Sequence, residues 1–351
     1  MNIQPQNERK MKLLKTSIIT FLLGLFIIGL SSTNTYAQDK RAAVKTYNKA
    51  LELVKSGKYE QAINMYNQAM TQAKKLGDDG KDIVNLVQKK LPQIYYQLSL
   101  QKYKAFRKES TLDNINATID AFQNTVDIAN EYSDKQISNK ATGVVTQLLY
   151  NKSLLQYQQQ KYKDALATLD NVIKRNANYA KAYYQKGIVI KHMDSRNFED
   201  AISLFDKAIE VGKKTNDKQL VQKANESARD ELVYQGSKNT ENKNFDKAVS
   251  LLQRALKYDA QSPKAYYRLA EAYNKTQDWQ KALNNAKKSL EYATGGKTDK
   301  AKIYFELATA YKGLGKKEEA CSAFGNAAYG SFKASAEHQM KYELKCESTT
   351  N

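Results

Sequence analysis

The sequence has few of the residues that break helices. It contains only 3 Pro and 15 Gly in 351 residues, while Ala, Leu, Lys, Gln and Glu are abundant. Proline and glycine are the strongest helix breakers, so their scarcity excludes a loop-rich or collagen-like chain. The length alone would allow two domains, but this composition favours a single all-α architecture.

The residues that commonly carry catalysis or bind metals are also scarce. There are only two histidines, His192 and His338, which lie far apart and outside any H-E-x-x-H spacing. Gly295 to Thr298 read Gly-Gly-Lys-Thr but lack the upstream glycine and the strand of a phosphate-binding loop, so we interpret them as a linker. Glu318 and Glu319 are adjacent on an expected helix and point apart. The sequence therefore predicts no enzyme, no cofactor and no metal site.

The N-terminus has the pattern of a secretory signal peptide. Arg9, Lys10, Lys12 and Lys15 precede an apolar run from Ile18 to Leu30, and small residues at Thr35 and Ala37 mark a cleavage site after Ala37. About a dozen apolar residues are few for a bilayer span. We expect residues 1–37 to be removed and the chain to reach the periplasm or cell envelope. An uncleaved N-terminal anchor is the alternative.

The chain is strongly basic. It carries 56 Lys+Arg against 37 Asp+Glu, and without residues 1–37 it retains 52 against 36, a net charge of +16. This excess favours attraction to an acidic protein, an acidic glycan or an anionic membrane surface, and a lysine-rich solvated face explains it equally well. Nucleic acid is disfavoured by the expected export.

Internal repeats organise the rest of the sequence. Three stretches, which begin at Pro263, Ala301 and Ala43, place small and aromatic residues at the same spacing. The matching residues are Tyr266, Ala270, Tyr273, Trp279 and Ala282; Tyr304, Leu307, Ala308, Tyr311, Gly315, Ala320, Phe324 and Ala327; and Ala50, Gly57, Tyr59, Ala62, Tyr66 and Ala69. Looser copies open at Thr146, Ala180 and Arg229, and a divergent one covers 92–130.

These positions resemble the tetratricopeptide-repeat (TPR) motif, a helix–turn–helix of about 34 residues. The resemblance implies about seven units stacked into a right-handed α-solenoid, because one unit cannot bury its apolar stripe alone. We expect N-terminal units over 38–143, a main array over 144–331, and a capping helix and tail over 332–351. The segments 76–82, 131–143 and 211–231 interrupt the spacing and are either hinges or longer helices.

The repeat register also makes two predictions about specific residues. Cys321 follows the packing alanine of its second helix and should face the terminal cap, so we expect it to form a disulfide with Cys346. Positions 2, 5, 9 and 12 of each first helix should line a concave groove for an acidic peptide or C-terminal segment. The candidate protein-binding residues are Tyr184, Lys191, Lys264, Tyr267, Asn274, Lys302, Phe305 and Lys312, with Tyr47 and Tyr150 at the same aromatic position.

Tyrosine and lysine would suit an acidic partner, although an aromatic residue at this position also serves packing in the motif. The carboxylate clamp of some family members is absent, because Tyr47, Leu51, Tyr184 and Ile188 stand at the equivalent positions. The resemblance therefore implies an exported scaffold or adaptor in an envelope-associated complex. The alternative is a charge-driven binder of an acidic glycan or anionic membrane surface.

Overall fold

The computed structural model describes residues 34–193 and 197–346, and every regular element within them is helical. These residues form two compact units, divided between Ile94 and Tyr95 inside one long helix. The predicted signal peptide falls largely outside the described residues. The first helix, α2 (Asn34–Lys55), begins before the predicted cleavage site, so Ala37 lies in its first turn. No helix of the described residues is long and apolar enough to cross a membrane.

The first unit contains one repeat and the start of the next. It consists of α2, α3 (Tyr59–Lys74), the short turn η1 (Gly77–Gly80) and the first half of α4 (Lys81–Lys108). The helices α2 and α3 pack together, with the rings of Tyr47 and Tyr66 5.4 Å apart. Ala50, Ala62 and Ala69 are fully buried, as expected of small residues that let two helices approach closely.

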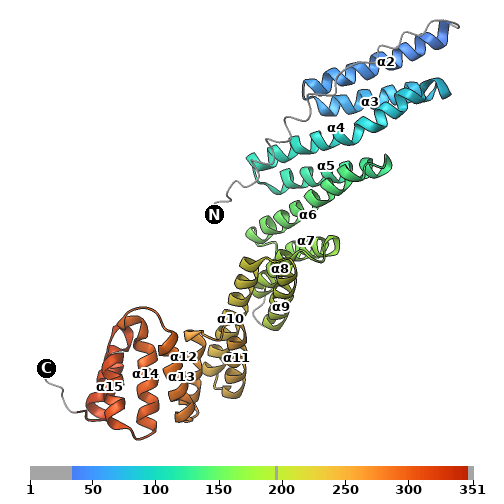
Figure 1. Ribbon diagram of the computed structural model, residues 1–351. Helices are drawn as coiled ribbons and strands as arrows, with labels where there is room; N and C mark the ends of the chain where they lie inside the picture. The colour runs from blue at the N-terminus through green and yellow to red at the C-terminus, as the bar shows by residue number, and fades with distance from the viewer. Residues whose placement is uncertain (1–33, 194–196, 347–351) are drawn as a thin grey trace. The chain divides into compact units, whose positions relative to one another are not determined.

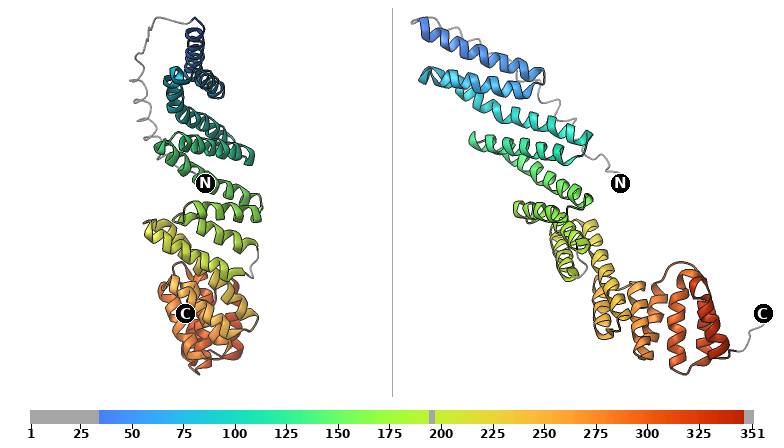
Figure 2. Two further views of the ribbon diagram at one scale, coloured as in Figure 1. Left: turned by 90° about the vertical axis from the view of Figure 1, so that its right-hand side faces the viewer. Right: turned by 180° about the vertical axis from the view of Figure 1, so that it is seen from behind.

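The second unit continues the alternation from the second half of α4 to the end of the described chain. Each helix packs against the next in sequence, which is the arrangement of a helical solenoid (Figure 1, Figure 2). The helices are α5 (Leu112–Glu131), α6 (Lys135–Gln158), α7 (Tyr162–Arg175), α8 (Ala180–Met193), α9 (Phe198–Lys214), α10 (Lys218–Glu241), α11 (Phe245–Tyr258), α12 (Pro263–Lys275), α13 (Trp279–Tyr292), α14 (Lys297–Gly313), α15 (Lys317–Ala327) and α16 (Lys333–His338).

The turn inside each repeat is set by local chemistry. The aromatic residues predicted at the turns, Tyr59, Tyr162, Phe198, Phe245 and Trp279, are the first residues of α3, α7, α9, α11 and α13. Two residues before four of these helices the backbone is left-handed, at Gly57, Gln160, Lys243 and Gln277. Gly315 has the same conformation two residues before α15. This conformation ends the first helix and turns the chain back.

The three interruptions of the repeat spacing are tight turns before long helices. Asp134 and Asp217 accept hydrogen bonds from the backbone N–H groups of Ile137 and Leu220, and so begin α6 and α10. Both helices have 24 residues, compared with 13 in α12. The expectation of longer helices thus describes these segments. The predicted boundary after residue 143 stays a prediction.

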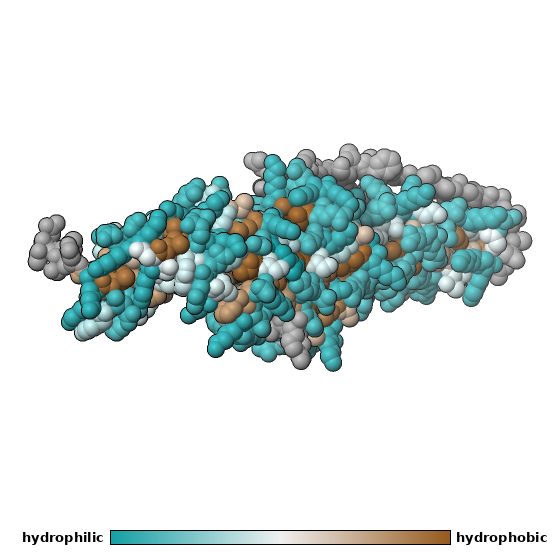
Figure 3. Space-filling view, turned by 90° about the horizontal axis from the view of Figure 1, so that it is seen from below, coloured by the Kyte–Doolittle hydropathy of each residue, from teal (hydrophilic) through white to brown (hydrophobic). Residues whose placement is uncertain are grey.

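Close contacts at small residues fix the packing of the second unit. Gly187 lies against the ring of Phe205, and Gly236 lies against Leu252, where an added Cβ would be 2.6 Å from the Leu252 Cγ. Large residues fill the space between helices, including the fully buried Phe122, Phe205 and Phe324. Most of the surface in Figure 3 is hydrophilic, and the hydrophobic residues that reach it lie in small separate areas.

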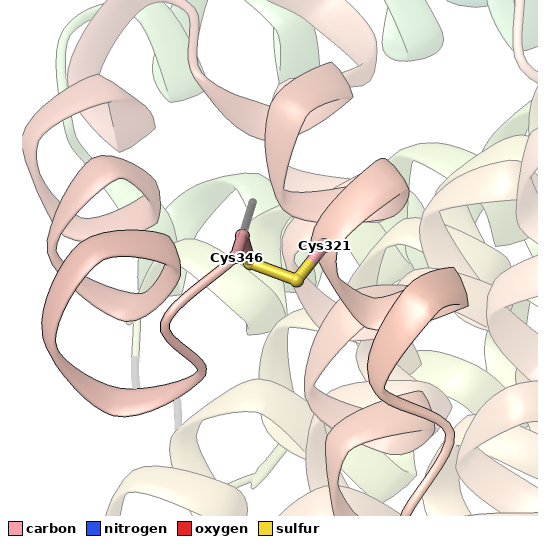
Figure 4. The surroundings of a disulfide bond; sticks show 2 residues. All are labelled: Cys321 and Cys346. Carbon is pink, nitrogen blue, oxygen red and sulfur yellow. A yellow bond between two sulfur atoms is a disulfide. The ribbon is translucent and has the colours of Figure 1, made fainter. Parts of the chain in front are cut away.

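The C-terminal end of the array is covered by a cap. A short turn, η3 (Gly330–Phe332), is followed by α16 and by one π-helical turn, η4 (Gln339–Glu343). Ala336, Met340 and Leu344 pack onto the last hydrophobic core, while most of the remaining cap residues are exposed. A disulfide joins Cys346, just after η4, to Cys321 of α15 (Figure 4). This is the pairing that the repeat register predicts.

Candidate functional site

The residues predicted to line a groove lie on the first helices of successive repeats, and several of them contact the neighbouring first helix. At the junction of α8 and α10 the hydroxyl groups of Tyr184 and Ser227 are 3.2 Å apart. Nearby, Lys191 Nζ lies 3.0 Å from Glu231 Oε2, and Glu231 is only 2 % exposed. Gln235 Nε2 donates a further hydrogen bond to Glu231. The predicted residues Tyr184 and Lys191 are therefore used to join two repeats.

The junction of α12 and α14 brings together three more of the predicted residues. Asn274 Nδ2 donates to the backbone oxygen of Glu306 at 2.9 Å and to its Oε2 at 2.8 Å. The Lys302 ammonium lies 5.5 Å from the centre of the Tyr267 ring, a cation–π contact. Tyr267 and Asn274 are both 7 % exposed. Together with Arg268 and Glu271, these residues form what we call the α12–α14 surface: Tyr267, Arg268, Glu271, Asn274, Lys302 and Glu306.

The two carboxyl groups of this surface have different partners. Glu271 Oε2 accepts a hydrogen bond from Arg268 at 2.7 Å. Within the described residues Glu306 forms no ion pair, and its carboxyl accepts from the neutral amide of Asn274. Burial raises the pKa of Glu306 to about 7, and the nearby charge of Glu271 adds to the effect. At neutral pH this carboxyl therefore exists in both protonation states.

Tyr267 and Arg268 of the same surface have pKa values above their ordinary range. Burial raises the pKa of Tyr267 to about 12, and the charge of Glu271 acts in the same direction. The ion pair with Glu271 holds Arg268 charged, with a pKa above its ordinary value. Glu306 is consequently the group of this surface that changes charge near neutrality.

The junction of α14 with the cap uses two more of the predicted residues. The ring of Phe305 lies between Phe324 of α15 and Phe332 of η3, with centroids 5.3 and 5.4 Å away. Lys312 Nζ donates to Gln339 Oε1 at 2.7 Å and lies 3.4 Å from Glu343 Oε2. Phe305 and Lys312 thus fasten the cap to the array.

The aromatic position of the predicted groove has a packing role throughout. Tyr47, Tyr184 and Phe305 each contact an aromatic ring on the second helix of their own repeat, and Tyr150 contacts Tyr179. Lys264 and Lys302 are the exposed members of the predicted set. Whether the set binds a protein stays a prediction.

Sequence reasoning missed Arg268, Glu306 and Glu231. Arg268 and Glu306 both occupy position 6 of a first helix, beside the positions that were read. The sequence feature that could have indicated this site is a charged residue at position 6 in two successive repeats. Its meaning depends on the neighbouring helix, because the same register elsewhere holds Gln185 and Tyr234.

The other motifs singled out in the sequence have structural roles. Gly295 and Gly296 form the link between α13 and α14, where Asp299 accepts a hydrogen bond from the Gly296 N–H. His192 contacts the ring of Tyr157, and His338 contacts Tyr342. In the described ranges, no three His, Cys, Asp or Glu side chains are grouped so as to hold a metal ion.

One open cavity of about 640 Å³ lies where α9, α10 and α11 meet. Arg229 crosses its wall and pairs with Asp259, and Tyr258 donates to Asp206 beside it. The polar groups that line this cavity therefore largely satisfy one another. The lining residues are Gly212, Lys213, Asn216, Lys218, Val221, Gln222, Asn225, Glu226, Arg229, Tyr258 and Asp259.

The fold defines a helical-repeat protein in which the first helix of one repeat contacts the first helix of the next. Three family models, each described as a tetratricopeptide repeat, match this chain over residues 47–75 and 296–329, 150–210 and 240–284. The chain belongs to the tetratricopeptide-repeat family. Proteins built from such stacked repeats present extended binding surfaces and act as scaffolds for other proteins.

Solved structures of similar fold include several repeat proteins. A MamA structure is 21% identical and covers 56% of this chain and 95% of its own, with a TM-score of 0.36. YrrB, described as a TPR protein with an unusual peptide-binding site, is 20% identical over 55% of this chain and 91% of its own, with a TM-score of 0.35.

A tetratricopeptide-repeat protein from Parabacteroides merdae ATCC 43184 covers more of the chain. It is 15% identical over 87% of this chain and 98% of its own, with a TM-score of 0.28. None of these likenesses carries an argument about function. No curated protein matches the sequence.

Proposed function

We propose that this protein is an exported, non-enzymatic scaffold that holds other proteins together in the cell envelope through the first helices of its repeats. The observation that carries the proposal is that tetratricopeptide-repeat models match residues 47–75, 150–210, 240–284 and 296–329, and that paired helices continue between these segments. Such an array offers a long surface for partners and little else. The signal-like N-terminus supports export.

The α12–α14 surface is the part of the array that best suits a partner. Lys302 stays exposed above the Tyr267 ring, and the exposed Lys264 precedes it by one repeat at the same position of the motif. By contrast, Tyr184, Lys191, Phe305 and Lys312 are committed to contacts between helices. A partner with acidic side chains or a free carboxylate would meet Lys264 and Lys302 first.

The test is in-cell cross-linking of the tagged protein, followed by mass spectrometry of the captured proteins. We expect one or two envelope proteins to be captured in stoichiometric amounts, and to be lost when Lys264 and Lys302 are both changed to Glu. A matched control changes Lys287 and Lys288 of α13 to Glu, which alters the net charge equally on a second helix. Equal loss in both variants would contradict binding through the first helices.

A second candidate function is charge-driven binding of an acidic glycan or an anionic membrane surface. Three exposed lysines support it, since Lys287, Lys288 and Lys297 lie over the rings of Tyr311, Tyr266 and Tyr329 and form no ion pair with another described residue. The two functions differ in their response to salt. Binding to a charged polymer should collapse between low salt and about 0.5 M salt, whereas a packed protein interface should largely persist.

A further inference from the structure

We propose that the α12–α14 surface binds an acidic segment of the partner, and that a proton on Glu306 switches this binding on. The proposal rests on the function proposed above and adds the chemistry of the partner and its control. It follows from the way charge is distributed over six residues.

While Glu306 is neutral, one lysine of this surface has no carboxylate partner among the described residues. Arg268 is paired with Glu271, so these two charges cancel locally. Lys302 lies over the Tyr267 ring and forms no ion pair with a described residue, and Lys275 adds a second positive charge near Glu306. A carboxylate on a partner therefore finds an attractive surface as long as Glu306 is neutral.

The surroundings of Glu306 favour its protonated, neutral form. Its carboxyl is held by the Asn274 amide, which has no charge, and Glu271 raises the cost of a second negative charge nearby. A largely buried carboxyl without a paired cation tends to take up a proton instead. Loss of that proton places a negative charge between Arg268, Lys275 and Lys302, where it competes with the carboxylate of a partner.

The charged and titratable groups that surround Glu306 come from three helices. From α12 it faces Tyr267, Arg268, Glu271 and Lys275, and from α14 it is accompanied by Lys302. From α10, Glu241 acts on Arg268 as a further carboxylate. The pKa of Tyr267 is raised to about 12, and the pKa of Arg268 lies above its ordinary value. Of Tyr267, Arg268 and Glu306, the last has the pKa that lies between pH 6 and 8.

The experiment measures binding of unlabelled, N-acetylated hexaglutamate to the purified protein by isothermal titration calorimetry at pH 6 and pH 8, at one low ionic strength. Hexaglutamate stays fully ionised over this range, so its own charge does not change. We expect tighter binding at pH 6. If only the neutral form of Glu306 binds, the affinity falls by about tenfold at pH 8, which is the ratio of the neutral fractions for a pKa of about 7.

Two variants complete the test. Glu306→Gln keeps the acceptor for Asn274 without the charge, and should bind equally at both pH values with the affinity of the wild type at pH 6. Lys302→Gln should weaken binding at both. A pH dependence that survives in Glu306→Gln would overturn the proton switch, and assign the effect to another group such as His192 or His338.

The remaining outcomes separate this proposal from the proposed function. Failure of hexaglutamate to bind at either pH, or equal binding of hexaglutamine, would overturn the acidic partner. Capture of envelope proteins in the cross-linking experiment would stand regardless, because it does not depend on the charge of the partner. If the wild-type protein captures no envelope protein, the scaffold function itself would be refuted.

Discussion

Lys191 of α8 and Glu231 of α10 form an ion pair at 3.0 Å across the junction of two repeats, and Glu231 is 2 % exposed. A charge buried this deeply is tolerated only because it is paired and hydrogen-bonded. The pair therefore fixes how these two repeats meet, and its loss should be felt beyond the two residues.

We expect Lys191→Ala to destabilise the protein by about 3 kcal/mol, because it leaves the buried Glu231 carboxylate without its cation. The double variant Lys191→Met with Glu231→Gln should recover most of this loss, since the glutamine still accepts from Gln235 without carrying a charge. Thermal and chemical unfolding of the three proteins check this. Equal destabilisation by the single and double variants would show that the unpaired Glu231 charge does not cause the loss of stability.

The close approach at Gly236 makes a second prediction. In Gly236→Ala the new methyl group would lie 2.6 Å from the Leu252 Cγ, so α10 and α11 must separate, at a cost of about 1–3 kcal/mol. Gly325→Ala in α15 is the matched control, because nothing lies within 4 Å of its Cβ position. A helical glycine that gains a methyl group without a clash should become more stable by about 0.5–1 kcal/mol. Opposite signs of the two effects in unfolding experiments are the expected result.

The disulfide between Cys321 and Cys346 should stabilise the cap rather than the whole array. It closes a loop with a sequence separation of 25, which contributes on the order of 3 kcal/mol in the chain-entropy account. With both cysteines changed to Ser, hydrogen exchange should accelerate over residues 330–346 and stay unchanged in α8 to α11. The mass of the alkylated native protein with and without reductant checks the bond itself, and two reactive thiols before reduction would contradict it.

Glu306 should make the stability of the protein depend on pH in an unusual direction. Its pKa is about 7 in the folded protein, against 4.5 ordinarily, so the folded state holds a proton that the unfolded chain has lost. Stability from this group is complete below about pH 4.5 and is lost as the pH rises to about 7, by at most about 3 kcal/mol.

The comparison with Glu306→Gln isolates this group. The stability of the variant relative to the wild type should rise between pH 5 and pH 8, because only the wild type must bury a charge at the higher pH. In the difference between the two unfolding free energies, the contributions of all titrating groups that the proteins share cancel. A relative stability that stays flat between these pH values would mean that Glu306 is ionised in the folded protein at pH 5.

The sequence by itself determined the repeat and its local geometry. The aromatic residues Tyr162, Phe245 and Trp279 marked the starts of the second helices. They recur at a fixed interval because each repeat needs a large side chain at the same point of its packing. The pairing of Cys321 with Cys346 followed from the same register. These features depend on contacts within one repeat or between neighbours, which the spacing of residues encodes directly.

The tertiary structure decided what the residues on the first helices do. Tyr267, Asn274 and Phe305 occupy positions that line a groove in the repeat motif. In this protein they mainly contact the next helix or the cap. The sequence alone did not single out Glu306. Its pKa is raised because burial, and then the nearby charge of Glu271, outweigh the Asn274 hydrogen bond, which lowers it. Burial and the choice of partner depend on residues some thirty positions away, so the spacing of residues within one repeat could not reveal them.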